Sequence, residues 1–252
     1  MADDAQTSTL VPAAARGPIK LIWGTLATLL SVIYTVILAP IAALCAFFGH
    51  PRPVTHLAKL WGWLIIRTCG IRVEIDGLDN LSGLKSYILV SNHQSFFDIF
   101  AVAAFMPGPI RFVAKRELLK IPVLGYALNN SCHIVIDRQA GGREIRRAIE
   151  VSKMGYSICV FAEGHRFNDN RVHDFEEGAA WLAILTKLPA VPMAISGSGG
   201  FFPRRAMIVV PGGMMRMRIG APIQTAGLRG ADRAELSHRL EQSVRAMFSE
   251  EP

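Results

Sequence analysis

Residues Tyr87–Phe105 read YILVSNHQSFFDIFAVAAF, and this stretch changes from one regular pattern to another. Residues 87–91 form a short apolar run of the kind that makes a buried strand, whereas the apolar residues from Phe96 onward have the length of a helix. A strand that leads directly into a helix is typical of α/β folds. Such folds place ligand-binding residues where the strand ends, so the turn around His93 is a candidate functional site.

The same alternation continues in both directions from this stretch. Short apolar and β-branched runs predict strands at Ile71–Ile75, Tyr87–Ser91, Ile110–Ala114, His133–Asp137, Ser157–Glu163, Ala190–Ser196, Ala206–Val210 and Met215–Ile219. Helical periodicity predicts helices at Phe96–Phe105, Arg116–Leu128, Arg143–Lys153, Glu177–Thr186 and Asp232–Phe248. We therefore expect an α/β fold with a mixed, mostly parallel sheet covered by helices. The last two strands have no helix between them, which predicts an antiparallel pair at one edge.

The segment from Leu21 to Gly49 contains no Asp, Glu, Lys or Arg. About 20 apolar residues in a helix cross the hydrocarbon layer, so this segment is long enough to span a membrane or to enter it and return. A cleaved signal peptide is the alternative, but its apolar region normally has about 7–15 residues. Pro40 kinks or ends a helix, so a helix from Ile19 to about Leu38 with a broken continuation competes with one straight helix.

The next segment, Val54–Cys69, has apolar residues at helical spacing, interrupted by Lys59 and Arg67. This pattern fits either a helix that lies on a membrane surface or an ordinary core helix, and its place after the apolar segment favours the surface. The expected organisation is a polar tail (1–18), a membrane-associated helical segment (19–69) and an α/β domain (70–252). Basic residues after the apolar segment favour the cytoplasmic face of the cell membrane for that domain.

Composition narrows the class of protein. The chain of 252 residues has 27 Lys or Arg against 20 Asp or Glu, a formal charge of +7, and 51% of it is hydrophobic. A chain of this length can bury a sizeable core, and so few charges argue against disorder. The four cysteines show no CxxC spacing, which argues against a disulfide scaffold or a zinc site. No nucleic-acid motif accompanies the basicity, so an anionic lipid surface is the simpler partner.

The turn after residue 91 carries groups suited to acid–base chemistry. His93 lies in this turn and Asp98 in the first helical turn, where a carboxylate can accept the Nδ1–H of the ring and leave Nε2 to take a proton from a hydroxyl. The run from Ser95 to Asp98 also matches a capping box, in which Asp98 would simply cap the helix. The residues alone leave both interpretations open. The chain contains no GxSxG motif for a serine nucleophile.

A second strand-to-turn boundary lies at Cys159–Arg166. Gly164 permits a positive φ and the close approach of a ligand. Arg166 offers a planar guanidinium that matches phosphate oxygens, and Glu163 can pair with it or bond a substrate hydroxyl. Taken by itself, this motif also fits a surface ion pair at a turn.

Together and in this order, these motifs resemble the glycerophospholipid acyltransferase family. Its first block, Asn-His-x4-Asp, is matched by Asn92, His93 and Asp98. Its other three blocks are matched by Lys115–Leu118 with Ile134–Arg138, by Phe161–Arg166, and by Val191–Ile195. The resemblance covers roughly residues 71–220, and the four blocks in sequence are more specific than any one alone.

The resemblance implies acyl transfer from acyl-CoA or acyl carrier protein to the free hydroxyl of a lysophospholipid, with 1-acylglycerol-3-phosphate as the acceptor and phosphatidate as the product. It makes His93 the general base and Asp98 its orienting partner, with no acyl-enzyme and no metal or redox cofactor. Backbone N–H groups near the Asn92 turn would be candidates for an oxyanion site. The implied acceptor-binding residues are Asn92, Lys115, Arg138, Glu163, Gly164, His165 and Arg166.

Two departures from the family pattern bear on the acceptor. His165 stands where the family has threonine, and Phe175-Glu176-Glu177-Gly178 replaces a Phe-Lys-x-Gly element. A carboxylate in place of a cation suits an acceptor that carries an amine, so a lyso-aminolipid is an alternative to lysophosphatidate. A lipid-binding or acyl-carrier-binding module without catalytic activity is the alternative from another class of function.

Overall fold

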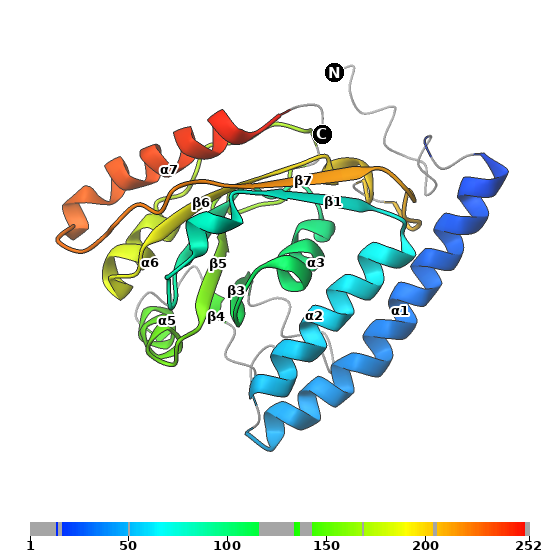
Figure 1. The fold of residues 1–252 in the computed structure, drawn as a ribbon, viewed down its shortest axis with the longest axis horizontal. Helices are drawn as coiled ribbons and strands as arrows, with labels where there is room; N and C mark the ends of the chain where they lie inside the picture. Colours follow the sequence, from blue (N-terminus) through cyan, green and yellow to red (C-terminus); the bar gives the residue numbers. More distant parts are fainter. Residues whose placement is uncertain are drawn as a thin grey trace.

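The computed structural model describes residues 14, 17–49, 51–115, 134–136, 143–167, 169–203 and 206–249. In this part of the chain seven strands form one sheet in the order β1-β7-β6-β2-β5-β3-β4 (Figure 1). The strands are β1 (Arg72–Asp76), β2 (Ile88–Ser91), β3 (Ile110–Lys115), β4 (Ile134–Ile136), β5 (Ser157–Phe161), β6 (Ala190–Ser196) and β7 (Met214–Ile219). All neighbouring strands are parallel except β6 and β7, which confirms the predicted mixed, mostly parallel sheet.

Helices cover both faces of this sheet. One face carries α1 (Pro18–Phe47), α2 (Pro51–Thr68) and α3 (Phe96–Phe105), and the other carries α5 (Arg143–Lys153), α6 (Gly178–Thr186) and α7 (Arg233–Met247) (Figure 1). Strand β2 shows why, because successive side chains of a strand point to opposite faces. Leu89 joins the apolar cluster beneath α2 and α3, whereas Ile88 and Val90 join the cluster beneath α5, α6 and α7.

Most predicted elements are present, and one is wrong. The helices predicted at Phe96–Phe105 and Arg143–Lys153 have the expected bounds, and the helix predicted at Arg116–Leu128 lies outside the described residues. Residues 206–210 form a loop instead of a strand. The N–H of Val209 donates to the Thr28 hydroxyl of α1 (3.0 Å), and that of Val210 donates to the Phe201 carbonyl (2.9 Å). These apolar residues pack against α1 and the preceding loop. The antiparallel neighbour of β7 is β6, and β1 lies at the edge parallel to β7, so the antiparallel pair predicted at one edge is wrong.

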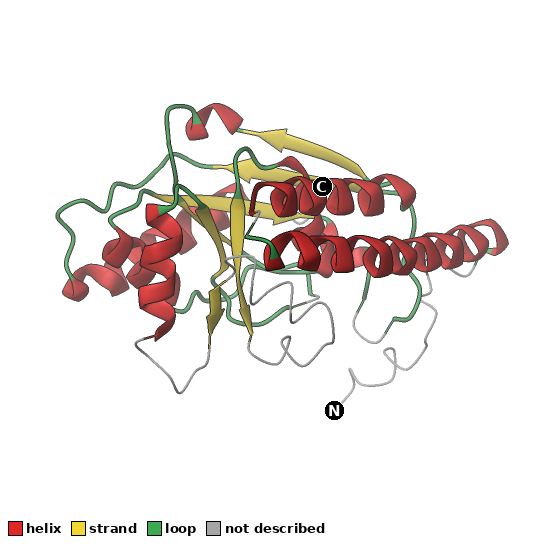
Figure 2. Ribbon diagram, turned by 90° about the horizontal axis from the view of Figure 1, so that it is seen from below, coloured by secondary structure: helices red, strands yellow, loops and turns green. Residues whose placement is uncertain are grey.

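The N-terminal apolar segment is one 30-residue helix, α1, which continues through Pro40. Figures 1 and 2 show α1 and α2 lying side by side at one side of the molecule. Hydrogen bonds join them, from Trp61 Nε1 to the Thr35 hydroxyl (2.9 Å) and between the hydroxyls of Tyr34 and Thr68 (3.1 Å). Within the described residues, α1 is the one helix long and apolar enough to cross a membrane.

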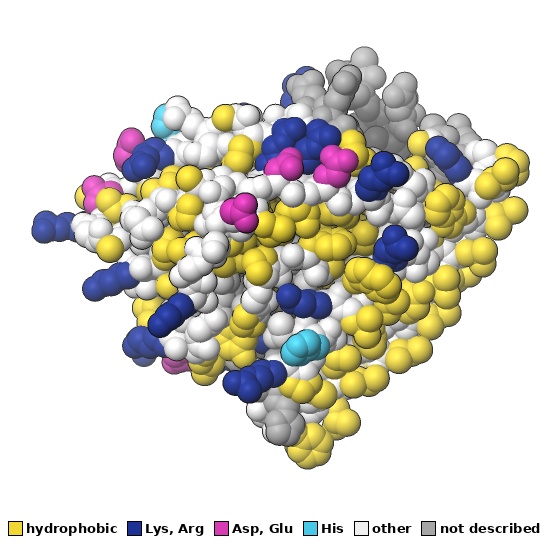
Figure 3. Space-filling view, in the orientation of Figure 1, with side chains coloured by type: hydrophobic (Ala, Val, Ile, Leu, Met, Phe, Trp, Pro, Cys, Tyr) yellow, Lys and Arg dark blue, Asp and Glu magenta, His cyan; other side chains and the backbone are white. Residues whose placement is uncertain are grey.

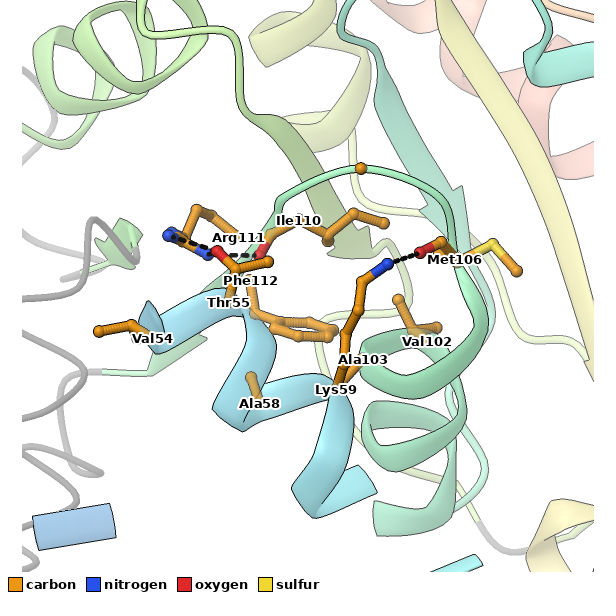
Figure 4. Close-up of a pocket in the computed structure, with 11 residues that line it drawn as sticks. Val54, Thr55, Ala58, Lys59, Val102, Ala103, Met106, Ile110, Arg111 and Phe112 are labelled. Carbon is orange, nitrogen blue, oxygen red and sulfur yellow. Dashed lines mark hydrogen bonds between the residues drawn. The ribbon is translucent and has the colours of Figure 1, made fainter. Parts of the chain in front are cut away.

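The helix α2 is held firmly between α1 and α3. Gly62 brings it so close to α3 that a Cβ there would collide with the Phe100 carbonyl. Nearer the start of α2, a small cavity lies between α2, α3 and the start of β3 (Figure 4). At its walls Lys59 donates to the Met106 carbonyl (3.1 Å), and Arg111, only 1% exposed, donates to the Thr55 hydroxyl (3.1 Å). These contacts fix α2 against the end of α3 and the start of β3.

Candidate active site

The sheet topology brings the two strand-end motifs together. Strands β2 and β5 are adjacent and parallel, with Ser91 paired to Phe161, so their carboxyl ends meet at the same edge of the sheet. His93 and Glu163 each lie two residues beyond these paired positions. The backbone N–H of His93 donates to Glu163 Oε2 (2.9 Å), which joins residues that are 70 positions apart in the sequence.

His93 and Asp98 form a hydrogen-bonded pair at the start of α3. Nδ1 of His93 lies 2.9 Å from Oδ2 of Asp98, and Asp98 is fully buried. An ionised carboxylate can only accept hydrogen bonds, so Nδ1 carries the proton and Nε2 is the basic nitrogen. No described residue hydrogen-bonds Nε2. The His93 side chain is 14% exposed, so the imidazole reaches the surface of the protein, where a substrate hydroxyl can approach it.

The same carboxylate also caps the helix. Oδ2 of Asp98 accepts the backbone N–H groups of Gln94 and Ser95, each at 2.8 Å, and the Ser95 hydroxyl accepts the N–H of Phe97 (3.4 Å). The capping box and the histidine pair are therefore one arrangement, and the two interpretations of the sequence do not exclude each other. Because Asp98 and Glu163 already accept the N–H groups of residues 93–95, these three groups do not form the oxyanion site expected at this turn.

An aromatic ring fixes the plane of the imidazole. Phe161, the last residue of β5, stacks on His93 with ring centroids 4.0 Å apart and an angle of 14° between the planes. Behind it Phe112, which also lines the cavity described above, lies parallel to Phe161 at 6.4 Å. The imidazole is thus held at one face by Phe161 and at one edge by Asp98.

Glu163 braces the backbone of the site. It is 4% exposed, and its Oε2 and Oε1 accept the backbone N–H groups of His93 and His173, each at 2.9 Å. Burial raises the pKa of the Glu163 carboxyl to about 7, although the two N–H donors act in the opposite direction. The carboxylate that the sequence suggested for Arg166 or a substrate hydroxyl therefore holds two loops in place. A direct role in binding the acceptor stays a prediction.

Gly164 and Arg166 follow Glu163 in the loop after β5. Gly164 has φ +67°, and a Cβ at this position would collide with the carboxylate of Glu176. The guanidinium of Arg166 lies over the ring of Phe96, the first residue of α3, with Cζ 4.0 Å from the ring centroid. This stacking places the cation beside the start of the helix that carries Asp98, and His165 next to it is exposed. Arg166 therefore lies close to the His93 turn.

The structure describes the other predicted acceptor-binding residues to different extents. Both polar atoms of the Asn92 amide bond the backbone of Ile195, at 2.8 and 2.9 Å, so Asn92 joins the ends of β2 and β6. Lys115 is the last residue of β3, and its side chain lies outside the described part of the structure. Arg138 lies outside the described residues. Their parts in an acceptor site stay predictions.

Sequence reasoning missed the residues that attach the loop after β5 to the His93 turn. The Gln94 amide accepts the N–H of Asn170 (3.2 Å) and donates to the Arg171 carbonyl (2.5 Å). The N–H of Phe167 donates to the His93 carbonyl (3.0 Å). The ring of Phe167 stacks on His173 (3.7 Å), whose Nε2 lies 2.7 Å from Asp169. An isolated glutamine in a turn gives no signal of such contacts before the fold is known.

Comparisons with known proteins show which family the chain is similar to. Residues 72–196 match the sequence model of the Acyltransferase family. The 1-acyl-sn-glycerol-3-phosphate acyltransferase of Pseudomonas aeruginosa is 30% identical over 233 residues, covering 91% of this chain and 85% of that protein. The human 1-acyl-sn-glycerol-3-phosphate acyltransferase alpha is 30% identical over 210 residues, covering 82% and 74%.

A solved structure supports the fold as well. The crystal structure of a 1-acyl-sn-glycerophosphate acyltransferase from Thermotoga maritima superposes with a TM-score of 0.73 at 24% identity, covering 90% of this chain and 97% of that one. This chain belongs to the glycerophospholipid acyltransferase family. It is an O-acyltransferase of phospholipid biosynthesis, as the resemblance in the sequence implied.

Proposed function

We propose that this protein transfers an acyl group from acyl-CoA or acyl carrier protein to the free hydroxyl of 1-acylglycerol-3-phosphate, which yields phosphatidate. The observation that carries the proposal is the His93–Asp98 pair, in which Nδ1 is bonded to the carboxylate and Nε2 has no hydrogen bond to a described residue. Nε2 takes the proton of the acceptor hydroxyl as its oxygen attacks the thioester carbonyl carbon. The C–S bond then breaks, and the leaving thiolate takes the proton from the imidazolium.

Arg166 is the residue that we propose binds the acceptor phosphate. Its guanidinium offers several donors in a plane, and the Phe96 ring beneath it restricts the directions in which they point. Phosphate bound there would lie near the start of α3, the positive end of that helix. Lys115, Arg138 and His165 are proposed as further contacts of the same headgroup, because of their places in the family's blocks.

We expect Arg166→Ala to raise KM for lysophosphatidate about tenfold or more with a smaller effect on kcat, because a hydrogen bond to a charged group contributes about 1.5–3 kcal/mol. The measurement is the initial rate of acyl transfer against acceptor concentration in detergent. Arg239→Ala removes an exposed arginine from α7 and is the matched control. An unchanged KM in the first variant would remove Arg166 from the phosphate site.

We further propose that α1 and α2 hold the enzyme at a membrane surface, with the active site on the cytoplasmic face of the cell membrane. The face of α1 that points away from the protein exposes large apolar side chains along its whole length, including Ile22, Leu29, Val36 and Leu44. Figure 3 shows hydrophobic side chains gathered along this side of the molecule. Soluble proteins rarely expose apolar patches of this extent, so a lipid layer is the environment that it suits.

The packing of α1 favours one mode of attachment. One face of the helix contacts α2 and the loop around Val209, so a second face alone remains for lipid. A helix of 30 residues is about 45 Å long, which exceeds the hydrocarbon thickness of about 30 Å. A helix bound sideways to its own domain suits insertion into one leaflet, parallel to the surface, better than an isolated span.

The double substitution Leu29→Asp/Val36→Asp should weaken binding to phospholipid vesicles roughly a hundredfold or more. Each lost apolar side chain contributes about 1.5–3 kcal/mol when it leaves water. Cosedimentation with vesicles measures the bound fraction, and circular dichroism checks the fold. Met154→Asp/Leu78→Asp changes two apolar side chains that are also exposed but lie outside α1. Equal binding of both variants would contradict a membrane role for the α1 face.

A second acceptor is favoured by the position of Glu176. Its carboxylate lies against Gly164, on the loop that carries Arg166, where it would attract an amine and repel a phosphate. An acyl-transfer assay against lysophosphatidate, zwitterionic lysolipids and lyso-aminolipids separates the two candidates. Preference for lysophosphatidate supports the first proposal, and preference for an amine-bearing acceptor replaces it. Binding of lysolipids without any transfer would favour a module that is not catalytic.

A further inference from the structure

The last turns of α7 hold the loop that follows the Glu163 brace. Arg245 donates to the Val172 carbonyl (2.6 Å) and contacts the Asp174 carboxylate (3.0 Å). Glu241, one turn earlier, accepts the N–H of Phe175 (2.9 Å). The two side chains also pair with each other at 2.8 Å. One ion pair on α7 therefore contacts residues 172, 174 and 175.

His173, which lies between these contacts, is linked through Glu163 to the His93 turn. The N–H of His173 donates to Glu163 Oε1, while Glu163 Oε2 accepts the N–H of His93. Glu163 is buried, so each of its two bonds is costly to lose, and a shift of residues 172–175 would move the carboxylate or break a bond. A continuous series of contacts thus runs from Arg245 to His93.

Both members of the pair are charged, and α7 does not depend on them to stay in place. Partial burial acts to raise the pKa of Glu241, but the Phe175 N–H and Arg245 outweigh it and hold that pKa below its usual value. The helix itself is anchored by Leu236, Leu240 and Val244, which are buried beneath it. Removal of the Arg245 side chain therefore leaves the helix packed and frees residues 172 and 174 from it, while Glu241 still accepts the N–H of Phe175.

We propose that the Glu241–Arg245 pair positions His93 from a distance, through residues 172–175 and Glu163. Neither side chain bonds His93 itself, and both act on the backbone that is linked to the proposed base. The effect on turnover rests on the proposed role of His93 as the general base. The effect on the backbone of the catalytic turn does not depend on that role.

The test compares Arg245→Ala with Arg239→Ala, an exposed arginine of the same helix with no hydrogen bond from its guanidinium to the described residues. Amide hydrogen exchange of the full chain in detergent is measured over residues 91–98 and 165–175. We expect Arg245→Ala to accelerate exchange in both segments and to lower kcat about tenfold, with KM for the acceptor within about twofold, because small misplacements of a base are costly. The control should match the unmodified protein.

Two further variants separate positioning from helix stability. The charge-swapped double variant Glu241→Arg/Arg245→Glu keeps opposite charges four residues apart on α7, but a carboxylate at 245 cannot donate to the Val172 carbonyl. We expect it to be as impaired as Arg245→Ala, whereas Arg245→Lys, which retains a charged donor, recovers most of the lost kcat.

Three outcomes would overturn the proposal. The first is that amide hydrogen exchange over residues 91–98 and kcat are both unchanged in Arg245→Ala. The others are full activity of the charge-swapped double variant and an equal loss of kcat in the Arg239→Ala control. If the unmodified protein transfers no acyl group to any lysolipid, the proposed function fails. The exchange measurement then still decides whether α7 controls the His93 turn, because it does not require turnover.

Discussion

Replacing His93 with alanine should lower kcat by a factor of about 10²–10⁴ while the protein stays folded, because this is the usual contribution of a positioned general base. The imidazole bonds Asp98 through Nδ1, so the substitution removes Nε2, the group proposed to take the hydroxyl proton. Asp98 retains the two backbone N–H donors that begin α3, so the fold should persist. Acyl transfer from a radiolabelled thioester to a lysolipid measures the loss.

His238→Ala is the matched control for this experiment. His238 is an exposed histidine on α7 whose ring contacts Gln242, one turn away. Its loss should leave kcat unchanged. Turnover of His93→Ala within about threefold of the unmodified protein, well below the range for a general base, would exclude proton transfer by His93. That result would favour the alternative of a lipid-binding module.

The second large effect is expected from Asp98→Asn, which should lower kcat about a hundredfold or more, within the range for general base catalysis. An amide oxygen can still accept the N–H groups of Gln94 and Ser95, so the start of α3 keeps its cap. The negative charge that would stabilise the imidazolium of the proposed mechanism is lost. Steady-state rates and thermal unfolding, measured on the same preparation, separate the chemical effect from the structural one.

Ser95→Ala is the matched control, because it removes the other half of the cap and leaves the His93–Asp98 bond intact. Loss of a helix cap typically costs about 1 kcal/mol, so this variant should melt earlier and keep its kcat. If Asp98→Asn instead behaves in the same way, with lower stability and ordinary turnover, then Asp98 is a cap alone.

The sequence predicted those parts of the fold that depend on local pattern. The helix Phe96–Phe105 and the strand before it follow from the spacing of apolar residues over short windows, and the structure has both. Ala206–Val210 is equally apolar, but its backbone bonds α1 and a neighbouring loop. Nothing within five residues distinguishes a strand from a loop packed beneath a helix, so this error could not be avoided without the tertiary structure.

The same difference between local pattern and tertiary contacts applies to the candidate site. His93 and Asp98 are five residues apart, and the turn that leads into α3 brings them together, so the pair could be proposed from sequence. Glu163 could be named but not understood, because its contacts depend on the adjacency of β2 and β5. The stacking of Phe161 on the imidazole depends on the same register. Contacts of this kind are set by strand order, which a single sequence does not reveal.

The polar side chains of α1 have a consequence for where catalysis takes place. Thr28 and Thr35 donate to carbonyls of their own helix and accept donors from the Val209 loop and from Trp61 of α2. No water is needed to satisfy these groups, so the contacts should survive in surroundings from which water is excluded. Since α2 in turn packs closely on α3, packed helices connect α1 to the His93 turn without a break. The depth at which His93 meets a lipid would then be set by helix packing rather than by a hinge.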